Sequence, residues 1–372
     1  MDQYFRKRDT SSIELRLLSN DSARILSDSS DWVVGIYALR SDENLLRQYT
    51  FLATNFMSQY DFETIAVFSE IDTLLSDSLT LSSGFRFERR DTNYHDSDGV
   101  RFTPNESHWG GRLALELNTE GGSLSYASVS RGYKAAGFNI DGSLPSDLRT
   151  FDEETLLEYE LGLKTMLFDN RLALQVALFF DDRRDQQVKS SLVRPRADGS
   201  TEFIDFFGNA AKGTNQGVEV DAHWIINDNF SLTGNVGLLD AKFDEFTNEF
   251  GENLSGRDQA HAPGYMFNLS LNFKKGPWFA GFSGDGKDEF FFSDRHPVKS
   301  DSYLIYHGSL GYQSDHWKLT LWGRNLGDKD YFVRAFGSFG NDPRKSYVTE
   351  PYRQFGEPRI TGITLEVNLR ES

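Results

Sequence analysis

Apolar and polar residues alternate one by one along many separate stretches of this chain. In NFSLTGNVGLL, the apolar residues Phe230, Leu232 and Val236 alternate with polar residues and glycines. MFNLSLNF and ITGITLEVNLR repeat the pattern, with amides and charges at the intervening positions. Successive side chains of a β-strand point to opposite faces of its sheet, so a period of two indicates strands with one apolar and one polar face. The pattern predicts a chain built of such strands from end to end.

The connectors between these strands alternate in length. Short turns such as LSDS at 75–78 and INDN at 226–229 alternate with longer connectors, for example those near 136–152 and 246–262. An antiparallel meander with short turns at one end and long loops at the other is typical of a transmembrane β-barrel, whose tilted strands cross the bilayer with about 9–11 residues. The sequence therefore predicts an all-β, antiparallel transmembrane barrel with its polar face lining a lumen.

Composition supports a barrel over a soluble fold. Aromatic residues make up 14% of the chain, yet its mean hydropathy is −0.51 and it contains no cysteine. A soluble β-sandwich or propeller is the alternative, but sandwich strands are shorter, at about 5–6 residues, and no propeller-type repeat occurs. The net charge of −17 argues against nucleic acid as a partner, because phosphate binding needs a positive surface.

We expect about fifteen strands. Closed bacterial barrels have even strand numbers, so an odd count whose first member lacks a hairpin partner indicates that N-terminal strands are missing. The expected strands lie near 11–18, 31–39, 60–74, 78–92, 106–118, 122–135, 153–168, 171–187, 202–226, 229–245, 264–274, 277–293, 301–314, 316–333 and 355–370.

Five motifs, in order along the chain, resemble the C-terminal part of a TonB-dependent outer-membrane receptor. They are SSIELRLLS with DWVVGIYAL, YASVSRGYKAAGFN, EETLLEYELGLKTML, NAAKGTNQGVEVDAHW, and WGRNLGDKDY with FGEPRITGITLEVNL. In the second motif Ala136 stands where the family usually has a further glycine. The resemblance implies a barrel of about 22 strands plugged by an N-terminal domain. Measured against that pattern, we expect 1–372 to be a single, partial barrel domain without the plug, the energy-coupling box and about seven strands. Its end, NLRES, departs from the closing aromatic residue usual in the family.

The same resemblance implies a function. Such receptors lie in the bacterial outer membrane and take up scarce nutrients, foremost ferric siderophore complexes, by energy-coupled transport. The implied partners are outer-membrane lipid, lipopolysaccharide, a ferric chelate and, through a plug outside this chain, the TonB complex. A passive outer-membrane pore and a non-functional truncated barrel are the alternatives.

The motif YASVSRGYKAAGFN ends in a basic, aromatic turn that admits two interpretations. The turn folds a loop and docks a plug, or its cations Arg131 and Lys134 meet lipopolysaccharide phosphates, the plug or an anionic ligand. Aromatic and basic loop residues suit an aromatic, anionic metal chelate through stacking and charge. The candidate ligand-binding residues are Tyr133, Lys134, Phe138, Arg334, Phe336, Phe339, Arg344 and Tyr347.

No enzymatic or metal chemistry is predicted. The chain has no phosphate-binding loop, and none of its 7 histidines pairs with another at the spacing of a zinc helix. Asp96 and Asp98 resemble the start of a calcium loop, but Tyr94 occupies the first ligand position, so we expect a solvated turn. We therefore expect no catalytic residue, cofactor or bound metal.

Overall fold

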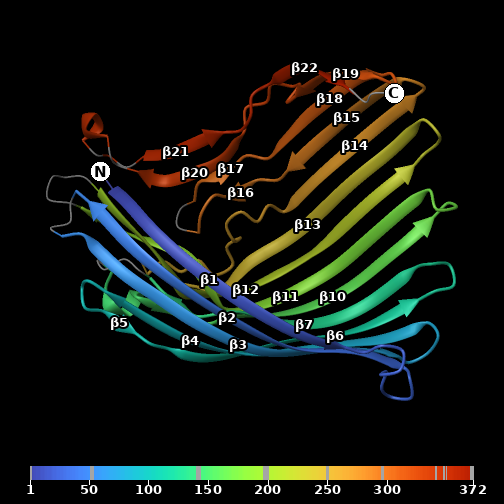
Figure 1. Ribbon diagram of the computed structural model, residues 1–372. Helices are drawn as coiled ribbons and strands as arrows, with labels where there is room; N and C mark the ends of the chain where they lie inside the picture. Colours follow the sequence, from blue (N-terminus) through green and yellow to red (C-terminus); the bar gives the residue numbers. More distant parts are fainter. Residues whose placement is uncertain are drawn as a thin grey trace. The chain divides into compact units, whose positions relative to one another are not determined.

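Regular structure in this protein is almost entirely β-strand (Figure 1). The computed structural model describes residues 2–50, 54–139, 144–195, 201–248, 251–294, 297–339, 342–346, 348 and 350–368. The helical turns in these ranges, η1 (Ser146–Leu148) and η2 (Pro343–Lys345), have three residues each and lie between strands. No helix in these ranges has the length and apolar character needed to cross a membrane.

The main sheet is a meander in which strands that follow one another in sequence are hydrogen-bonded neighbours. Its path consists of β1 (Asp2–Leu18), β2 (Ser30–Tyr49), β3 (Phe56–Leu74), β4 (Leu79–Asp96), β6 (Asn105–Asn118), β7 (Leu124–Lys134), β10 (Glu154–Leu167), β11 (Leu172–Pro195), β12 (Thr201–Ile225), β13 (Phe230–Phe246), β14 (Tyr265–Lys275), β15 (Trp278–Lys287), β18 (Tyr303–Gln313), β19 (Trp317–Arg324) and β22 (Ile360–Val367). A short strand, β5 (Arg101–Phe102), pairs with β4. The all-β, antiparallel fold predicted from the alternation is confirmed.

Three small hairpins lie outside the main sheet. They are β8 (Gly137–Phe138) with β9 (Thr150–Phe151), β16 (Phe290–Phe291) with β17 (Lys299–Ser300), and β20 (Phe332–Phe339) with β21 (Glu350–Phe355). The strands expected at 277–293 and 316–333 are therefore each broken: β15 ends at Lys287 and β19 at Arg324, and the aromatic residues beyond them form hairpins of their own.

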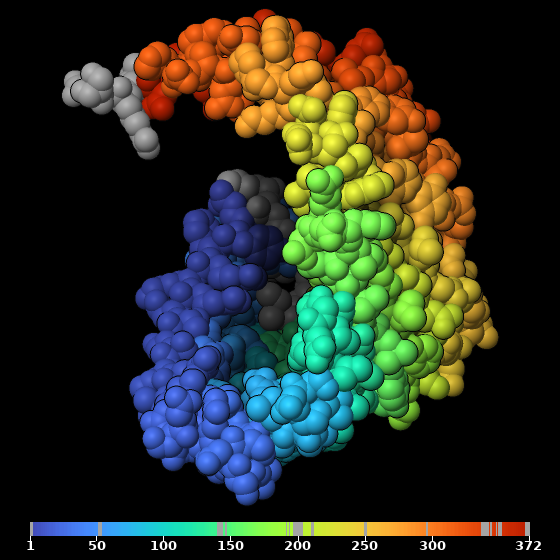
Figure 2. All heavy atoms as spheres, turned by 90° about the vertical axis from the view of Figure 1, so that its right-hand side faces the viewer, coloured from blue at the N-terminus to red at the C-terminus, as the bar shows by residue number. Residues whose placement is uncertain are grey.

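The chain forms two compact units. Unit 1 comprises Met1–Leu117, Ala127–Glu158 and Phe206–Asn209; unit 2 comprises Asn118–Tyr126, Tyr159–Asp205 and Ala210–Ser372. Within each unit the colour in Figure 2 changes gradually from strand to strand, because sequence neighbours are also neighbours in space.

In unit 1, one face of the sheet carries a continuous apolar band. A row of directly opposed residues crosses β1, β2, β3, β4 and β6, and each of its side chains is 43–65% exposed: Leu15, Ile36, Val67, Phe87 and Trp109. Further along the same face, Arg40 opposes Glu63 and their side chains form an ion pair of 3.2 Å. An exposed apolar band that gives way to ion pairs matches the lipid-facing surface of a barrel and its polar margin.

Several strands are longer than the sequence predicts. β1 begins at Asp2 rather than near 11, and β2 continues to Tyr49 through a segment expected to be a connector. In these extensions polar residues also occupy the face that carries the apolar band: Lys7 opposes Asn44, and Asp9 opposes Asp42. The backbone pairing continues beyond the apolar band, but the alternation that marks a strand in the sequence does not.

In unit 2 the two faces are as predicted. Asp221, Asn235, Asn268 and Asp285 form one cross-strand row on β12 to β15, and Asn268 donates a hydrogen bond of 2.5 Å to Asp285. The neighbouring row, on the opposite face, consists of Val220, Val236, Phe267 and Gly286. Residues expected to face the lumen therefore share one face, and residues expected to face lipid share the other.

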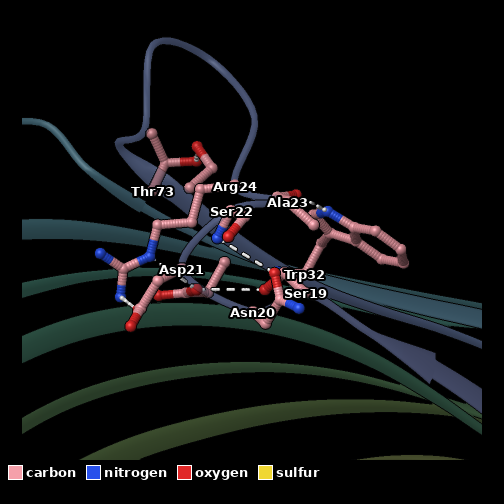
Figure 3. A network of polar contacts seen from close by, with 10 residues as sticks. Ser19, Asn20, Asp21, Ser22, Ala23, Arg24, Trp32 and Thr73 are labelled. Carbon is pink, nitrogen blue, oxygen red and sulfur yellow. Dashed lines mark hydrogen bonds and ion pairs between the residues drawn. The ribbon is translucent and has the colours of Figure 1, made fainter.

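The connector at 19–29, between β1 and β2, is held by polar contacts (Figure 3). Arg24 donates to Asp31 at 3.0 Å, and the Trp32 indole donates to the Ala23 carbonyl oxygen at 2.9 Å. The hydrogen bond from Arg24 holds the pKa of Asp31 below its ordinary value. Ser19 bonds to Asp31 as well, at 3.1 Å. The connector is therefore an ordered cap on the end of the first hairpin.

Candidate functional site

The aromatic turn at 133–139 packs on β3, β4 and β5 within unit 1. Phe138 contacts three aromatic rings, with centroid distances of 4.0 Å to Tyr94, 5.1 Å to Tyr60 and 5.9 Å to Phe102. Before it, Gly137 is packed so closely that a Cβ would lie 2.5 Å from the Phe151 ring. The motif therefore needs its second glycine, Gly137, and tolerates alanine at 136.

Asn139 is the buried clamp of this turn. Its side-chain amide donates to the carbonyl oxygens of Leu148 and Phe207, each at 2.8 Å, and its Oδ1 accepts the Phe207 N–H at 2.8 Å. Next to this contact, Asn209 donates to the Asp152 carbonyl oxygen at 2.9 Å and accepts from the Asp152 N–H. The motif that ends at Asn139 is thus hydrogen-bonded to Phe207, which lies just before the motif that begins at Asn209.

A buried ion pair closes the other side of the turn. Arg149 donates from Nε to the Asn139 carbonyl oxygen and from Nη2 to Asp96, both at 2.9 Å. The Asp96 side chain is 0% exposed and also accepts a hydrogen bond of 2.8 Å from Tyr94. The expectation that Asp96 lies in a solvated turn is therefore wrong for its side chain, because Arg149, which is distant in sequence, covers it.

Burial and hydrogen bonding act in opposite directions on this carboxylate. Burial alone would raise the pKa of Asp96, but hydrogen bonds from Tyr94 and Arg149 outweigh it and lower the pKa. Burial, assisted by the neighbouring Asp96, raises the pKa of Tyr94. Asp96 and Arg149 therefore form a charged pair, and the Tyr94 hydroxyl beside them stays protonated.

The two cations of the motif differ in environment. Arg131 lies over the Trp109 ring, with its guanidinium carbon 4.2 Å from the ring centroid, and its Nη2 is 3.7 Å from Glu153. Lys134 is exposed, with Nζ 5.8 Å from the Phe207 centroid. Tyr133 stacks on His108 at 4.9 Å and donates to Glu88 at 3.2 Å.

The eight candidate ligand-binding residues fall into two groups. In unit 1, the rings of Tyr133 and Phe138 are engaged in packing, which fits the loop-folding interpretation, while Lys134 is open to solvent. In unit 2, Arg334 is exposed on β20, and Arg344 is exposed and bonded to Asp342. Tyr347 lies outside the described residues, as do the side chains of Phe336 and Phe339.

Sequence reasoning missed a second aromatic and basic cluster, in unit 2. Phe291 contacts two cations, with the Arg257 guanidinium carbon 4.1 Å and the Lys299 Nζ 4.4 Å from its centroid. Lys287 lies 4.2 Å over Phe290. The run FFF at 290–292 is the sequence feature that could indicate this cluster, but it also fits the strand expected at 277–293.

The polar face of unit 2 is hollowed below this cluster. A groove of about 440 Å³ is lined by polar side chains, among them Asp221, Asn268, Asp285 and Lys287, and by others such as Met266 and Tyr303. His307 lies at the edge of this row, and its Nε2 is 2.8 Å from the Asp285 carboxylate. Among the residues the structure describes, no three His, Asp or Glu side chains are grouped so that they could hold a metal ion.

Comparison with known proteins agrees with this architecture. Residues 2–326 match a family model described as TonB dependent receptor-like, beta-barrel. The pesticin receptor of Yersinia pestis is 26% identical over 339 residues, which cover 87% of this chain and 47% of that receptor. The pesticin receptor of Yersinia enterocolitica is 25% identical over the same length. The chain thus spans about half the length of the curated relatives it matches.

Two solved structures share the fold. The ferric yersiniabactin uptake receptor FyuA from Yersinia pestis superposes with a TM-score of 0.78 and 22% identity, covering 98% of this chain and 55% of that one. The siderophore receptor PiuA from Acinetobacter baumannii gives a TM-score of 0.73 and 15% identity, covering 97% and 56%.

Proposed function

The chain belongs to the TonB-dependent receptor-like β-barrel family, and from this premise we propose that it forms the membrane wall of a receptor for energy-coupled uptake of a ferric siderophore. Its place is the bacterial outer membrane, where receptors of this family lie. The relatives are receptors by name, and we assign no catalytic role to the chain.

The observation that supports a ferric chelate most directly is the chemistry at the long-connector ends of the strands. In both units these ends combine aromatic rings with cations, as in Lys134 beside Phe207 and Phe291 beside Arg257 and Lys299. Rings stack on aromatic chelating groups, and cations attract the negative charge of a ferric complex. The two structural neighbours named above are siderophore receptors by title.

We keep the eight loop residues as proposed ligand contacts, with the exposed cations Lys134, Arg334 and Arg344 first. Energy coupling would act through a plug-type domain outside 1–372, all of which we assign to the barrel. Lipopolysaccharide is a proposed neighbour of the polar margin above the apolar band.

Binding to the natural full-length protein in detergent tests the ligand class. We expect a ferric siderophore with aromatic chelating groups, such as ferric yersiniabactin, to quench tryptophan fluorescence more strongly than ferric citrate at equal concentration. Combined Lys134→Ala and Arg334→Ala replacement should weaken binding by about tenfold, since each removes an exposed cation. Lys7→Ala, which removes an exposed lysine paired with Asp9, should leave affinity unchanged. Equal affinity for all three proteins would refute these contacts.

A further inference from the structure

His108, on β6, is buried between two carboxylates. The residue is 2% exposed, and its Nδ1 is 3.0 Å from Oε2 of Glu153, at the end of the connector that leads into β10. Its Nε2 is 3.8 Å from Oε2 of Glu106, and this buried nitrogen has no hydrogen-bond partner. A buried polar atom without a partner costs free energy and calls for an explanation.

The positions of the two carboxylates leave a neutral imidazole unsatisfied. A neutral ring carries one proton, which must be on Nδ1 to donate to Glu153 at 3.0 Å. The Nε2 lone pair then faces the Glu106 carboxylate, and two acceptors oppose one another. One additional proton removes the conflict, either on Nε2 as an imidazolium or on Glu106 as a carboxylic acid that donates to Nε2.

Charges around the cluster nearly balance without that proton. On β4, Glu88 opposes His108, Arg86 bonds to Glu88, and Arg90 opposes Glu106. On β7, Arg131 faces Glu153, and Tyr133 stacks on the imidazole. Asp152 adds a further negative charge near Glu106. The three arginines offset Glu88, Glu106 and Glu153, so Asp152 leaves the surroundings slightly negative and receptive to a proton.

We propose that Glu106, His108 and Glu153 bind one proton between them, and that this proton strengthens the hydrogen bond by which Glu153 holds the end of the connector, at 144–153, to the barrel wall. Glu153 belongs to the connector, whereas Glu106 and His108 belong to β6. With the proton bound, the ring donates to Glu153 as an imidazolium, or as an imidazole polarised by a donor on Nε2, and charge-assisted hydrogen bonds are about twice as strong as neutral ones. After loss of the proton the bond to Glu153 remains, but it is weaker because a neutral ring donates it while Nε2 faces the Glu106 carboxylate.

The expected pH dependence has a definite sign. In the proposed cluster the folded protein holds a proton that the separated groups of the unfolded chain release at neutral pH. A group whose pKa is raised in the folded state contributes stability at low pH that is lost as the pH rises through the raised value. The connector should therefore be more firmly attached in mildly acidic medium and looser in alkaline medium.

Hydrogen–deuterium exchange of the natural full-length protein in detergent tests the proposal. Protection factors, which correct for the intrinsic effect of pH on exchange, are compared for peptides covering 144–153 at about pH 5.5 and about pH 8.5. We expect about tenfold higher protection at the lower pH. Peptides from the cap at 19–29 should change little over the same interval, because its Asp31 is ionised at both values.

Two variants separate the proton from packing. Glu106→Gln keeps the shape and offers an N–H to Nε2 at every pH, so protection should stay high and lose its pH dependence. His108→Gln can serve only one of the two carboxylates, so protection should stay low at both values. The matched control is Glu63→Gln, on the opposite face and paired with Arg40, which should retain the wild-type response. A pH response that persists in Glu106→Gln and His108→Gln, or that is absent from the wild type, overturns the proposal.

Discussion

The carboxamide of Asn139 pairs with the main chain of Phe207 in both directions, accepting the Phe207 N–H and donating to its carbonyl oxygen, each at 2.8 Å. The two residues are 68 positions apart in the sequence. The Asn139 amide hydrogen-bonds to both the N–H and the carbonyl oxygen of Phe207, as a neighbouring strand would. It therefore fixes the position of the aromatic turn against β12.

Replacing this clamp should release the turn. Asn139→Ala leaves the Leu148 and Phe207 carbonyl oxygens and the Phe207 N–H without their partner, and we expect a loss of about 3 kcal/mol in the free energy of unfolding. Guanidinium-induced unfolding in detergent measures it. Asn93→Ala, at an exposed position of β4, is the control and should cost less than about 0.5 kcal/mol. Similar losses for both variants would show that Asn139 is not a clamp.

The buried pair of Asp96 and Arg149 should be strongly coupled. Removing either partner leaves a buried charge uncompensated, so Asp96→Ala and Arg149→Ala should each cost about 3–5 kcal/mol, and the double variant much less than the sum. Because the pKa of Asp96 is lowered, the stability it contributes is present above its ordinary pKa of 3.8 and is lost as the pH falls through the lowered value. A double-mutant cycle at neutral pH measures the coupling, and simple additivity would contradict it.

Two glycines on the polar face of neighbouring strands offer a matched test of packing. A Cβ on Gly217 would lie 2.3 Å from the Leu238 carbonyl oxygen and 2.6 Å from the Phe179 ring, whereas a Cβ on Gly237 would meet nothing within 4 Å. We expect Gly217→Ala to destabilise the protein by about 1–3 kcal/mol and Gly237→Ala to be nearly neutral. Thermal unfolding of the two variants distinguishes them, and the reverse order would contradict the assigned register.

Two adjacent residues on β14 test which face of the sheet meets lipid. Leu271 and Asn272 are both exposed, but Leu271 lies on the apolar face and Asn272 on the polar one. Arginine on a lipid-facing position near the middle of the bilayer costs about 2–4 kcal/mol, and much less on the lumen side. Refolding into lipid vesicles should therefore be weakened by Leu271→Arg and tolerated with Asn272→Arg. Equal effects would mean that the apolar face does not meet lipid.

The sequence predicts the strands of this protein well where one face is apolar. The alternation in 229–239 and 266–273 assigns both the strand and the side on which Val236 and Asn268 lie, because burial in lipid imposes the period of two. Above the apolar band that constraint ends. Lys7 and Asn44, for example, are polar although they lie on the face of β1 and β2 that carries the apolar band, so the alternation disappears while the backbone ladder continues.

The candidate site is less predictable because its contacts join residues remote in sequence. In the sequence Asp96 belongs to a hydrophilic segment that predicts an exposed turn. Its side chain is buried because Arg149, 53 residues further along the chain, bonds to it. The resemblance of YASVSRGYKAAGFN to a family motif locates the turn but does not tell which partner Asn139 clamps. Phe290 and Phe291 were missed because a run of aromatic residues is also what a membrane-crossing strand contains.

The central claim is that the chain serves energy-coupled uptake of a ferric siderophore, and transport in living cells tests it most directly. Cells lacking the gene, and the same cells carrying the natural full-length protein, are supplied with radioactive iron as ferric yersiniabactin, with and without a protonophore that abolishes the inner-membrane proton gradient. We predict that iron accumulates only when the protein is present and the gradient is intact. Accumulation that does not depend on the protein, or that the protonophore leaves unchanged, would contradict the account and favour a passive pore.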